Sequence, residues 1–375
     1  MSSGEFGKSV PAPATPPADP DRPTITLSGW SDLYFSYNFN APSNGLNALR
    51  LYDAKHDHVG FNSLAFDVAW SVGPVSGHAV LQLGTLISEF YPYAGTVTRV
   101  QQELPFRLMQ EVTLGWRPTL GGRQPLAIEG GIFVAPFGVE YIQIYKNWNW
   151  SPSNLFYICP FQIAGLRASW TFNDRWTVRG GVYSGWDQIV DDDNAFRTVL
   201  LQGEYSVGER FFLSAQYMIG VERSRGAPEG PWTRHAFDLY ADYQPLQRLQ
   251  LRAHVFTGLE PNRLGTAGWF GAALYARVKA FDWLYLAARG DIVREWVPDG
   301  AASMFGLDAS LLGSATVTAE LLPHRHLSFR VEYRHDQANA DQYFRDNVPQ
   351  ARMTGTDLPN ASGQYTVTVG ATAWF

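Results

Sequence analysis

The sequence predicts an all-β fold, a transmembrane antiparallel up-and-down β-barrel of about sixteen strands. Three observations lead to this fold class. Apolar and polar residues alternate in segments of strand length, the gaps between these segments alternate between short and long, and the final segment ends on an aromatic residue. A transmembrane barrel needs all three, because its strands meet lipid on one face and water on the other.

The last segment, 364–375, shows the alternation most clearly. One set of positions is apolar: Tyr365, Val367, Val369, Ala371, Ala373 and Phe375. The alternate set is mostly polar and includes Gln364, Thr366 and Thr368. Side chains of a strand point to opposite faces with a period of two, so the odd positions are expected to face lipid. A terminal aromatic such as Phe375 is typical of the closing strand of a bacterial outer-membrane barrel, where the barrel-assembly machinery reads it.

From Thr24 onward the chain contains about sixteen alternating segments, each near the length that a tilted membrane strand needs. The predicted strands are 24–38, 61–71, 78–86, 107–117, 126–134, 161–172, 175–185, 197–207, 210–221, 233–244, 248–258, 267–279, 282–293, 310–321, 326–335 and 364–375.

The gaps between these segments predict how the chain crosses the membrane. The short gaps are Val72–Gly77, Pro118–Pro125, Asn173–Asp174, Gly208–Glu209, Pro245–Gln247, Ala280–Phe281 and Leu322–Arg325. The long gaps are 39–60, 87–106, 135–160, 186–196, 222–232, 259–266, 294–309 and 336–363. Short periplasmic turns and long extracellular loops are expected of outer-membrane barrels.

The two faces of the predicted strands differ in chemistry. In 326–335, for example, Leu327, Phe329, Val331 and Tyr333 alternate with Ser328, Arg330, Glu332 and Arg334. Segment 282–293 is ambiguous, and we place its Arg289 and Asp291 inside because lipid penalises charges. Aromatic residues on the lipid side gather beside the short turns, as an interfacial girdle requires: Trp70, Trp116, Phe172, Trp176, Tyr205, Phe211 and Tyr243.

The composition agrees with a barrel and excludes other classes. Charged residues make up only 17% of the 375 residues, and no apolar run approaches the ~20 residues of a transmembrane helix. The net charge of −6 argues against a nucleic-acid partner, which asks for a basic patch. Cys159 is the one cysteine, so neither a disulfide framework nor a cysteine-based zinc site is expected.

The chain is expected to form one domain with a flexible lead-in. Residues 1–23 are rich in Pro and Ala and cannot bury a core, whereas residues 24–375 keep one uniform barrel composition. The first eight residues have neither the basic nor the apolar region of a signal peptide. The expected location, the bacterial outer membrane, therefore rests on the strand pattern.

Part of the chain resembles a known family. Gly131–Glu140, Pro160–Arg167 and Tyr183–Asp187, the last followed by Asp191–Asn194, resemble the OmpL-like β-barrel porins of Gram-negative bacteria. These stretches cover less than a fifth of the chain, and they contain no catalytic signature. The resemblance implies an outer-membrane pore for small solutes that works without a cofactor and contacts outer-membrane lipid and lipopolysaccharide.

About sixteen strands enclose more space than side chains can fill, so we expect an aqueous channel for small polar solutes or ions. The ionisable residues expected to line this pore are Asp32, Asp67, Glu111, Glu129, Arg167, Arg179, Glu204, Asp238, Asp242, Arg252, Arg277, Arg289, Glu320, Arg330, Glu332 and Arg334. Acidic and basic walls that face each other would create a transverse field that favours polar solutes. The alternative is that these charges pair along neighbouring strands and only keep the wall soluble.

The loop 135–160 is the third long gap, and a third loop folds inward and narrows the pore in many general porins. Its candidate constriction residues are Glu140, Tyr141, Tyr145, Lys146, Trp148 and Trp150. The alternative is an outer cap that packs on neighbouring loops.

Other functions have weaker support in the sequence. His56-Asp57-His58 and His324-Arg325-His326 lack further spaced ligands, so no metal site is expected there. Asp191-Asp192-Asp193-Asn194 could bind Ca²⁺ but lacks the spacing of an EF-hand. Neither a nucleophile elbow nor a phosphate loop is present, so we expect no enzyme. A lipid hydrolase, a plugged structural or adhesion barrel and a soluble β protein remain as alternatives, and the sequence does not fix the oligomeric state.

Overall fold

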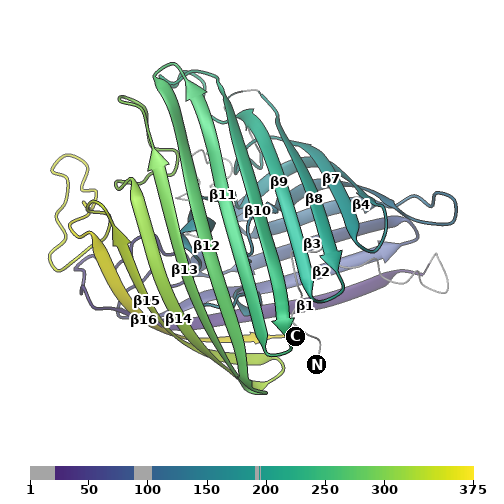
Figure 1. Ribbon diagram of the computed structural model, residues 1–375, viewed down its shortest axis with the longest axis horizontal. Coiled ribbons are helices and arrows are strands. Elements are labelled where there is room, and N and C mark those ends of the chain that lie inside the picture. The colour runs from purple at the N-terminus through teal and green to yellow at the C-terminus, as the bar shows by residue number, and fades with distance from the viewer. Residues whose placement is uncertain (1–21, 88–103, 191–193, 195) are drawn as a thin grey trace.

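The computed structural model describes residues 22–87, 104–190, 194 and 196–375, and in these the chain forms one closed barrel. Sixteen antiparallel strands follow one another around the barrel in sequence order, and β1 pairs with β16 to close it (Figure 1). The sixteen predicted strands and the fold class are therefore confirmed. Closure gives every strand two hydrogen-bonded neighbours, which is the condition for crossing a bilayer with strands.

The strands are β1 (Thr24–Asn38), β2 (His58–Val72), β3 (Val75–Leu83), β4 (Met109–Trp116), β5 (Leu126–Val134), β6 (Gln162–Thr171), β7 (Trp176–Tyr183), β8 (Thr198–Val207), β9 (Phe211–Val221), β10 (Thr233–Leu246), β11 (Leu249–Asn262), β12 (Gly265–Phe281), β13 (Leu284–Trp296), β14 (Leu311–His324), β15 (Leu327–Ala338) and β16 (Gly363–Trp374). The helices whose bounds lie in the described residues are α2 (Leu104–Arg107), η1 (Ile144–Lys146) and α3 (Asn154–Ile158). No helix of the described residues is long and apolar enough to span a membrane.

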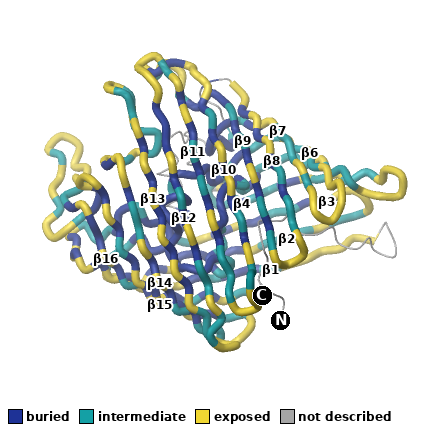
Figure 2. The backbone as a smooth tube through the Cα atoms, in the orientation of Figure 1, coloured by how far each residue is buried: buried dark blue, intermediate teal, exposed yellow. Residues whose placement is uncertain are grey.

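The two faces of the wall alternate as the sequence predicts (Figure 2). On β15, Phe329, Val331 and Tyr333 are 43–47% exposed, whereas Arg330, Glu332 and Arg334 are 1–2% exposed. The odd-numbered positions of β16 likewise point outward. The apolar face is thus the outer one, which lipid covers, and the polar face points into the barrel.

Aromatic rings form a belt on the outer surface beside the short turns. The contacts run from Trp176 to Tyr205 at 4.6 Å between centroids, then to Phe211 and Tyr243 at 6.4 Å each. Rings that are apolar in body and polar at the edge prefer the headgroup level of a bilayer, so this belt marks one membrane boundary.

One predicted loop is wrong. The sequence suggests a long gap at 259–266, but β11 and β12 pair as far as Asn262 and Gly265 and are joined by a two-residue turn. The strands extend because Glu260 keeps its inward orientation, where it pairs with Arg223 and Arg234. With 17 residues β12 is the longest strand, and the turn between β11 and β12 lies at the top of Figure 1. The alternation of short and long gaps is a tendency of this chain and not a strict rule.

Candidate functional site

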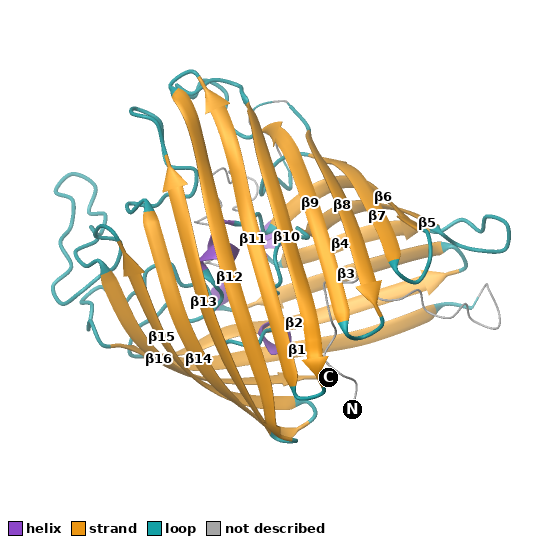
Figure 3. Ribbon diagram, in the orientation of Figure 1, coloured by secondary structure: helices purple, strands orange, loops and turns teal. Residues whose placement is uncertain are grey.

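Residues 135–161, between β5 and β6, fold into the barrel and form the centre of the candidate site. The segment carries η1 and α3, which lie inside the ring of strands in Figure 3. Ser153 caps α3, since its hydroxyl accepts a hydrogen bond from Phe156 N at 3.2 Å. The side chains of a sixteen-strand wall cannot fill its interior, and this segment occupies part of that space.

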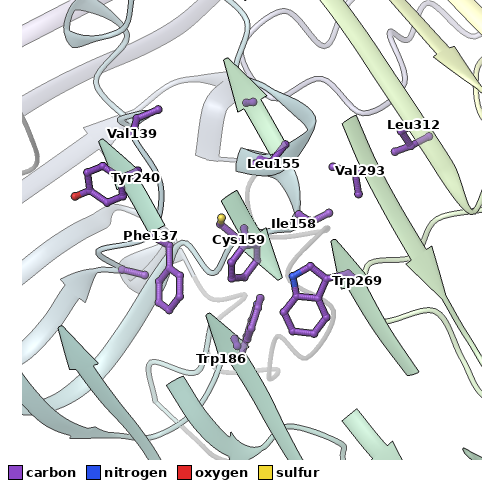
Figure 4. Packing of buried hydrophobic residues seen from close by; sticks show 14 of the residues in the cluster. Phe137, Val139, Leu155, Ile158, Cys159, Trp186, Tyr240, Trp269, Val293 and Leu312 are labelled. Carbon is purple, nitrogen blue, oxygen red and sulfur yellow. The ribbon is translucent and has the colours of Figure 1, made fainter. Parts of the chain in front are cut away.

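Apolar side chains of the segment pack on the inner wall. Phe137, Leu155, Ile158 and Cys159 belong to one buried cluster with residues of the opposite wall, including Tyr240 and Trp269 (Figure 4). Trp150 belongs to a second cluster and lies against β16, where a side chain at Gly370 would collide with its ring. The hydrophobic effect therefore favours the inserted position over an outer cap.

Wall carboxylates bind the backbone of the segment. Glu332 accepts hydrogen bonds from Trp150 N at 2.6 Å and Ser151 N at 2.9 Å, from the Ser151 hydroxyl, and from Thr318 of the wall at 2.8 Å. Arg334, two residues along the same strand, donates to Pro152 O and to Asn154 Oδ1. Charged hydrogen bonds of this kind fix the segment to β15.

A second group of charges fixes the segment to β13. Glu140 of the segment accepts two hydrogen bonds from Ser153 N at 3.0 Å and forms an ion pair with Arg289 at 3.1 Å. Arg289 also donates to Ser151 O at 2.6 Å. Asp291 accepts from Asn154 N at 3.2 Å and Nδ2 at 2.8 Å.

The candidate constriction residues divide into a packed and an open group. Glu140, Trp148 and Trp150 are buried, and Trp148 lies under the guanidinium of Arg252 at 4.1 Å. Tyr141, Tyr145 and Lys146 are partly exposed. The Lys146 ammonium lies 5.6 Å from the Tyr141 ring and 5.8 Å from the Tyr145 ring. The open group forms the edge of the segment that a solute could reach.

The wall charges named from the sequence also fall into two groups. Those behind the segment are buried: Asp32, Asp238, Asp242, Arg252, Arg289, Glu320, Arg330, Glu332 and Arg334. Glu204 on β8 is buried too, and the Arg277 side chain is 15% exposed. The accessible group lies on β2 to β7, with side chains 10–27% exposed, and the 15% of Arg277 on β12 falls in the same range. The members of the group are Asp67, Glu111, Glu129, Arg167 and Arg179.

Nearly all accessible charges have partners on neighbouring strands. Glu129 pairs with Arg167 at 2.9 Å, and Arg179 pairs with Glu204 at 2.6 Å. The same pairing occurs behind the segment, for example between Arg252 and Asp242 at 2.6 Å. The geometry favours the paired alternative over two separate walls of opposite charge.

Sequence reasoning missed two elements of the site. His78 lies between Asp67, at 2.8 Å, and Glu111, at 3.7 Å, in the accessible group. Arg50 of the loop 39–57 is fully buried and pairs with Asp53 at 3.0 Å and Asp336 at 2.8 Å. The inward positions of β3 could have pointed to His78, but no local pattern marks Arg50 as a loop residue that folds inward.

Among the described residues, one group of side chains offers possible metal ligands. Cys159, Asp238 and His254 are buried, and one ligand atom from each lies within 4.8 Å of the others. Asp238 is already engaged, because it binds His254 and accepts from Gly138 N at 3.1 Å. The group therefore serves as a further contact between the segment and the wall.

The two histidine motifs form hydrogen bonds within the protein. His56 Nδ1 accepts from Asn38 N at 3.0 Å, and His324 Nδ1 accepts from His326 N at 3.3 Å. Residues 191–193 of the Ca²⁺ candidate lie outside the described residues.

A closed barrel with an apolar outer face, a charged inner face and an inserted segment defines an outer-membrane channel protein. The family described as "putative beta-barrel porin-2, OmpL-like" matches residues 24–375, and the chain belongs to this family. The resemblance seen in the sequence and the outer-membrane location are confirmed, and the family supports a channel function.

Solved porin structures share the fold at low sequence identity. The anion-selective porin from Comamonas acidovorans aligns with a TM-score of 0.58 and 10% identity over 94% of this chain and 100% of that one. The trimer form of in-vitro folded OmpT from Vibrio cholerae gives 0.58 and 10% over 95% and 100%. The channel DcaP of Acinetobacter baumannii gives 0.57 and 11% over 94% and 97%. A comparison with curated protein sequences gave no match.

Removing the charge of Glu332 should loosen the segment. In Glu332→Gln the side chain keeps its shape but no longer presents two anionic oxygens to Trp150, Ser151 and Thr318. We expect the free energy of unfolding to fall by about 1.5–3 kcal/mol, which is the contribution of one hydrogen bond to a charged group. Urea titration of the refolded barrel measures this, with Glu209→Gln in an exposed turn as the control. Equal midpoints for the two variants would contradict the assigned role.

The pH dependence of stability should reveal Asp187. This loop carboxylate accepts from Phe161 N at 2.6 Å and Gln162 N at 3.1 Å, at the end of the segment. Burial, with a smaller effect of Glu222, raises the pKa of Asp187 to about 7. Because the folded state then holds a proton that the unfolded state has lost, stability should fall as the pH rises from about 4 to about 7, by on the order of 4 kcal/mol.

The variant Asp187→Asn should remove this part of the pH dependence. Urea midpoints measured between pH 4 and pH 8 test the expectation. A wild-type curve whose slope persists unchanged in Asp187→Asn would assign the effect to another group.

Proposed function

We propose that the channel conducts small polar solutes or ions passively, along the wall formed by β2 to β8. The observation that carries the proposal is the asymmetry of the interior. The segment 135–161 is held by charges of β13 and β15, whereas charged side chains on β2 to β6 remain partly exposed toward the short turns, most of all His78 and Asp67 at 32% and 27%. A solute that follows the accessible side chains meets ion pairs and the edge formed by Tyr141, Tyr145 and Lys146.

Selectivity in this proposal comes from size and from local ion pairs. Glu129 with Arg167 and Arg179 with Glu204 offer both signs of charge within a few ångströms, which suits polar solutes. The accessible wall also holds Asp67 and Glu111, which share His78.

The proposal includes partners that the barrel itself implies. The apolar belt contacts outer-membrane lipid and lipopolysaccharide. Phe375 serves as the signal for the barrel-assembly machinery, and small polar solutes are the cargo. We expect neither a cofactor nor a catalytic step. A lipid hydrolase would need a serine beside a histidine on the outer surface. His235 Nδ1 instead lies 2.8 Å from the Tyr217 hydroxyl, which gives the lipid-hydrolase alternative no support.

A plugged barrel is the second candidate, and one observation favours it. The inserted segment and the buried charges behind it fill the interior beside β9 to β16. A plugged structural barrel would use this packing for stability alone and would not conduct.

Deleting 141–152 should separate these two functions. The wild-type protein should conduct in planar-bilayer recordings, and the deletion should raise the single-channel conductance because it removes the open edge and part of the inserted segment. A deletion of 351–355, at the exposed tip of the loop 339–362, is the matched control and should leave the conductance near the wild-type value. A silent wild-type protein that conducts only after the deletion of 141–152 would instead identify a plugged barrel.

The ion pairs of the accessible wall should set ion preference. Arg167→Glu and Arg179→Glu each replace a cation by an anion next to an existing carboxylate, so the reversal potential in a salt gradient should shift toward cation selectivity. Arg167→Lys keeps the charge and should leave the preference unchanged. Should both charge reversals behave like Arg167→Lys, the conduction path does not run along this wall.

A further inference from the structure

The outer surface of the barrel carries an apolar groove of about 520 Å³ across β10 to β13, the strands in front in Figure 1. Its floor consists of small outward-facing residues: Ala241, Ala253, Ala276, Ala288 and Gly290. The floor residues are neighbours across the ladders, since Ala241 pairs with Ala253 and Ala276 with Ala288. Its volume lies within the range of small-molecule sites in proteins.

Larger side chains bound the groove. Tyr243 and Leu251, a pair across β10 and β11, line it toward the short turns, and Leu274 lines it from β12. On the next row toward the turns, Val278 pairs with Leu286. A hollow among large lipid-facing side chains leaves them without contacts unless an apolar group fills it.

Two arginines lie in the short turns at the end of the barrel nearest to the groove, and we call this end the rim. Arg248 occupies the turn between β10 and β11, and its backbone carbonyl accepts from Lys279 N at 2.9 Å. Arg210 lies in the turn between β8 and β9, where its carbonyl accepts from Gln244 N at 2.8 Å. Both arginines are exposed, and neither guanidinium forms an ion pair with a described residue; Asp282, the exposed carboxylate in the next turn, pairs with Lys279 at 2.9 Å. A basic side chain at the membrane surface attracts anionic lipid headgroups.

The spacing between this rim and the groove matches a lipid. Leu251 follows Arg248 by three residues, which is roughly 10 Å along a strand. One leaflet contributes about 15 Å to the hydrocarbon thickness. A chain that starts from a headgroup at the level of Arg248 therefore reaches the groove before the middle of the bilayer.

We propose that the groove and Arg248 together bind one phospholipid of the periplasmic leaflet, with an acyl chain on the alanine floor and the phosphate on the guanidinium. This lipid site is separate from the conduction path and does not depend on it. The rim favours a lipid over a second copy of the chain, because a copy would offer few free anions: Asp282 already pairs with Lys279 at 2.9 Å, and Glu209 lies beside Arg210 in the same turn. The apolar floor excludes a polar ligand.

Native mass spectrometry of the full chain in detergent, with added dioleoylphosphatidylglycerol, tests the site. The wild-type barrel should retain one lipid. Arg248→Glu should weaken retention by at least about fivefold, the effect expected for one basic residue near the membrane surface. Ala253→Phe should fill the floor and weaken retention of both phosphatidylglycerol and dioleoylglycerol, whereas Arg248→Glu should leave dioleoylglycerol, which lacks the phosphate, unaffected.

Matched controls come from another part of the wall. Ala168 faces outward on β6, and Arg175 occupies the turn that follows, so Ala168→Phe and Arg175→Glu repeat the two changes away from the groove. Heat-modifiable mobility on gels confirms that each variant forms a barrel. Equal loss in test and control variants, or a wild-type barrel that retains no lipid, would overturn the proposal. A change of oligomer mass in Ala253→Phe without a change in bound lipid would also overturn it and assign the face to subunit contact.

Discussion

The interior of this barrel depends on one constraint: a charged group that is cut off from water must have a partner. The inner positions of β9 to β16 carry many carboxylates and guanidiniums, and the segment 135–161 separates them from solvent. Glu332 meets the constraint with two backbone N–H groups of the segment, and Arg334 meets it with a backbone carbonyl. The charges of the wall and the path of the segment therefore determine each other.

This mutual dependence explains why the interior is asymmetric. Apolar residues of the segment pack on Tyr240 and Trp269 and also reach Phe133 on β5 and Ile163 on β6, so the cover ends before the inner charges that lie nearer to the short turns of these strands. The charges that remain accessible there are Asp67, Glu111, Glu129 and Arg167. The inserted segment thus leaves part of the inner wall near the short turns open to water, including Arg277 and Lys279 on β12.

The sequence predicts the wall well and the interior poorly, for physical reasons. Alternation with a period of two is a local property, so all sixteen strands and the inward orientation of Glu332 can be read from neighbouring residues. The contact between Glu332 and Trp150 joins residues 182 apart, and no local pattern encodes it. The prediction of a loop at 259–266 is wrong for a related reason. Glu260 continues the strand because its inward side chain pairs with Arg223, which is distant in the sequence. Arg50 was missed because its partner Asp336 lies near the other end of the chain.

Pairing between neighbouring strands also changes how the wall charges act. An ion pair such as Arg179 with Glu204 has almost no net charge at a distance, so a solute senses it only in contact. A transverse field across the lumen would need unpaired charges on opposite walls. In the accessible group, negative charge exceeds positive charge most clearly where Asp67 and Glu111 flank His78. This trio holds two carboxylates for one imidazole, so it is the most acidic part of the accessible wall. A solute that follows this wall therefore meets an acidic trio on β2 to β4 and balanced ion pairs on β5 to β8.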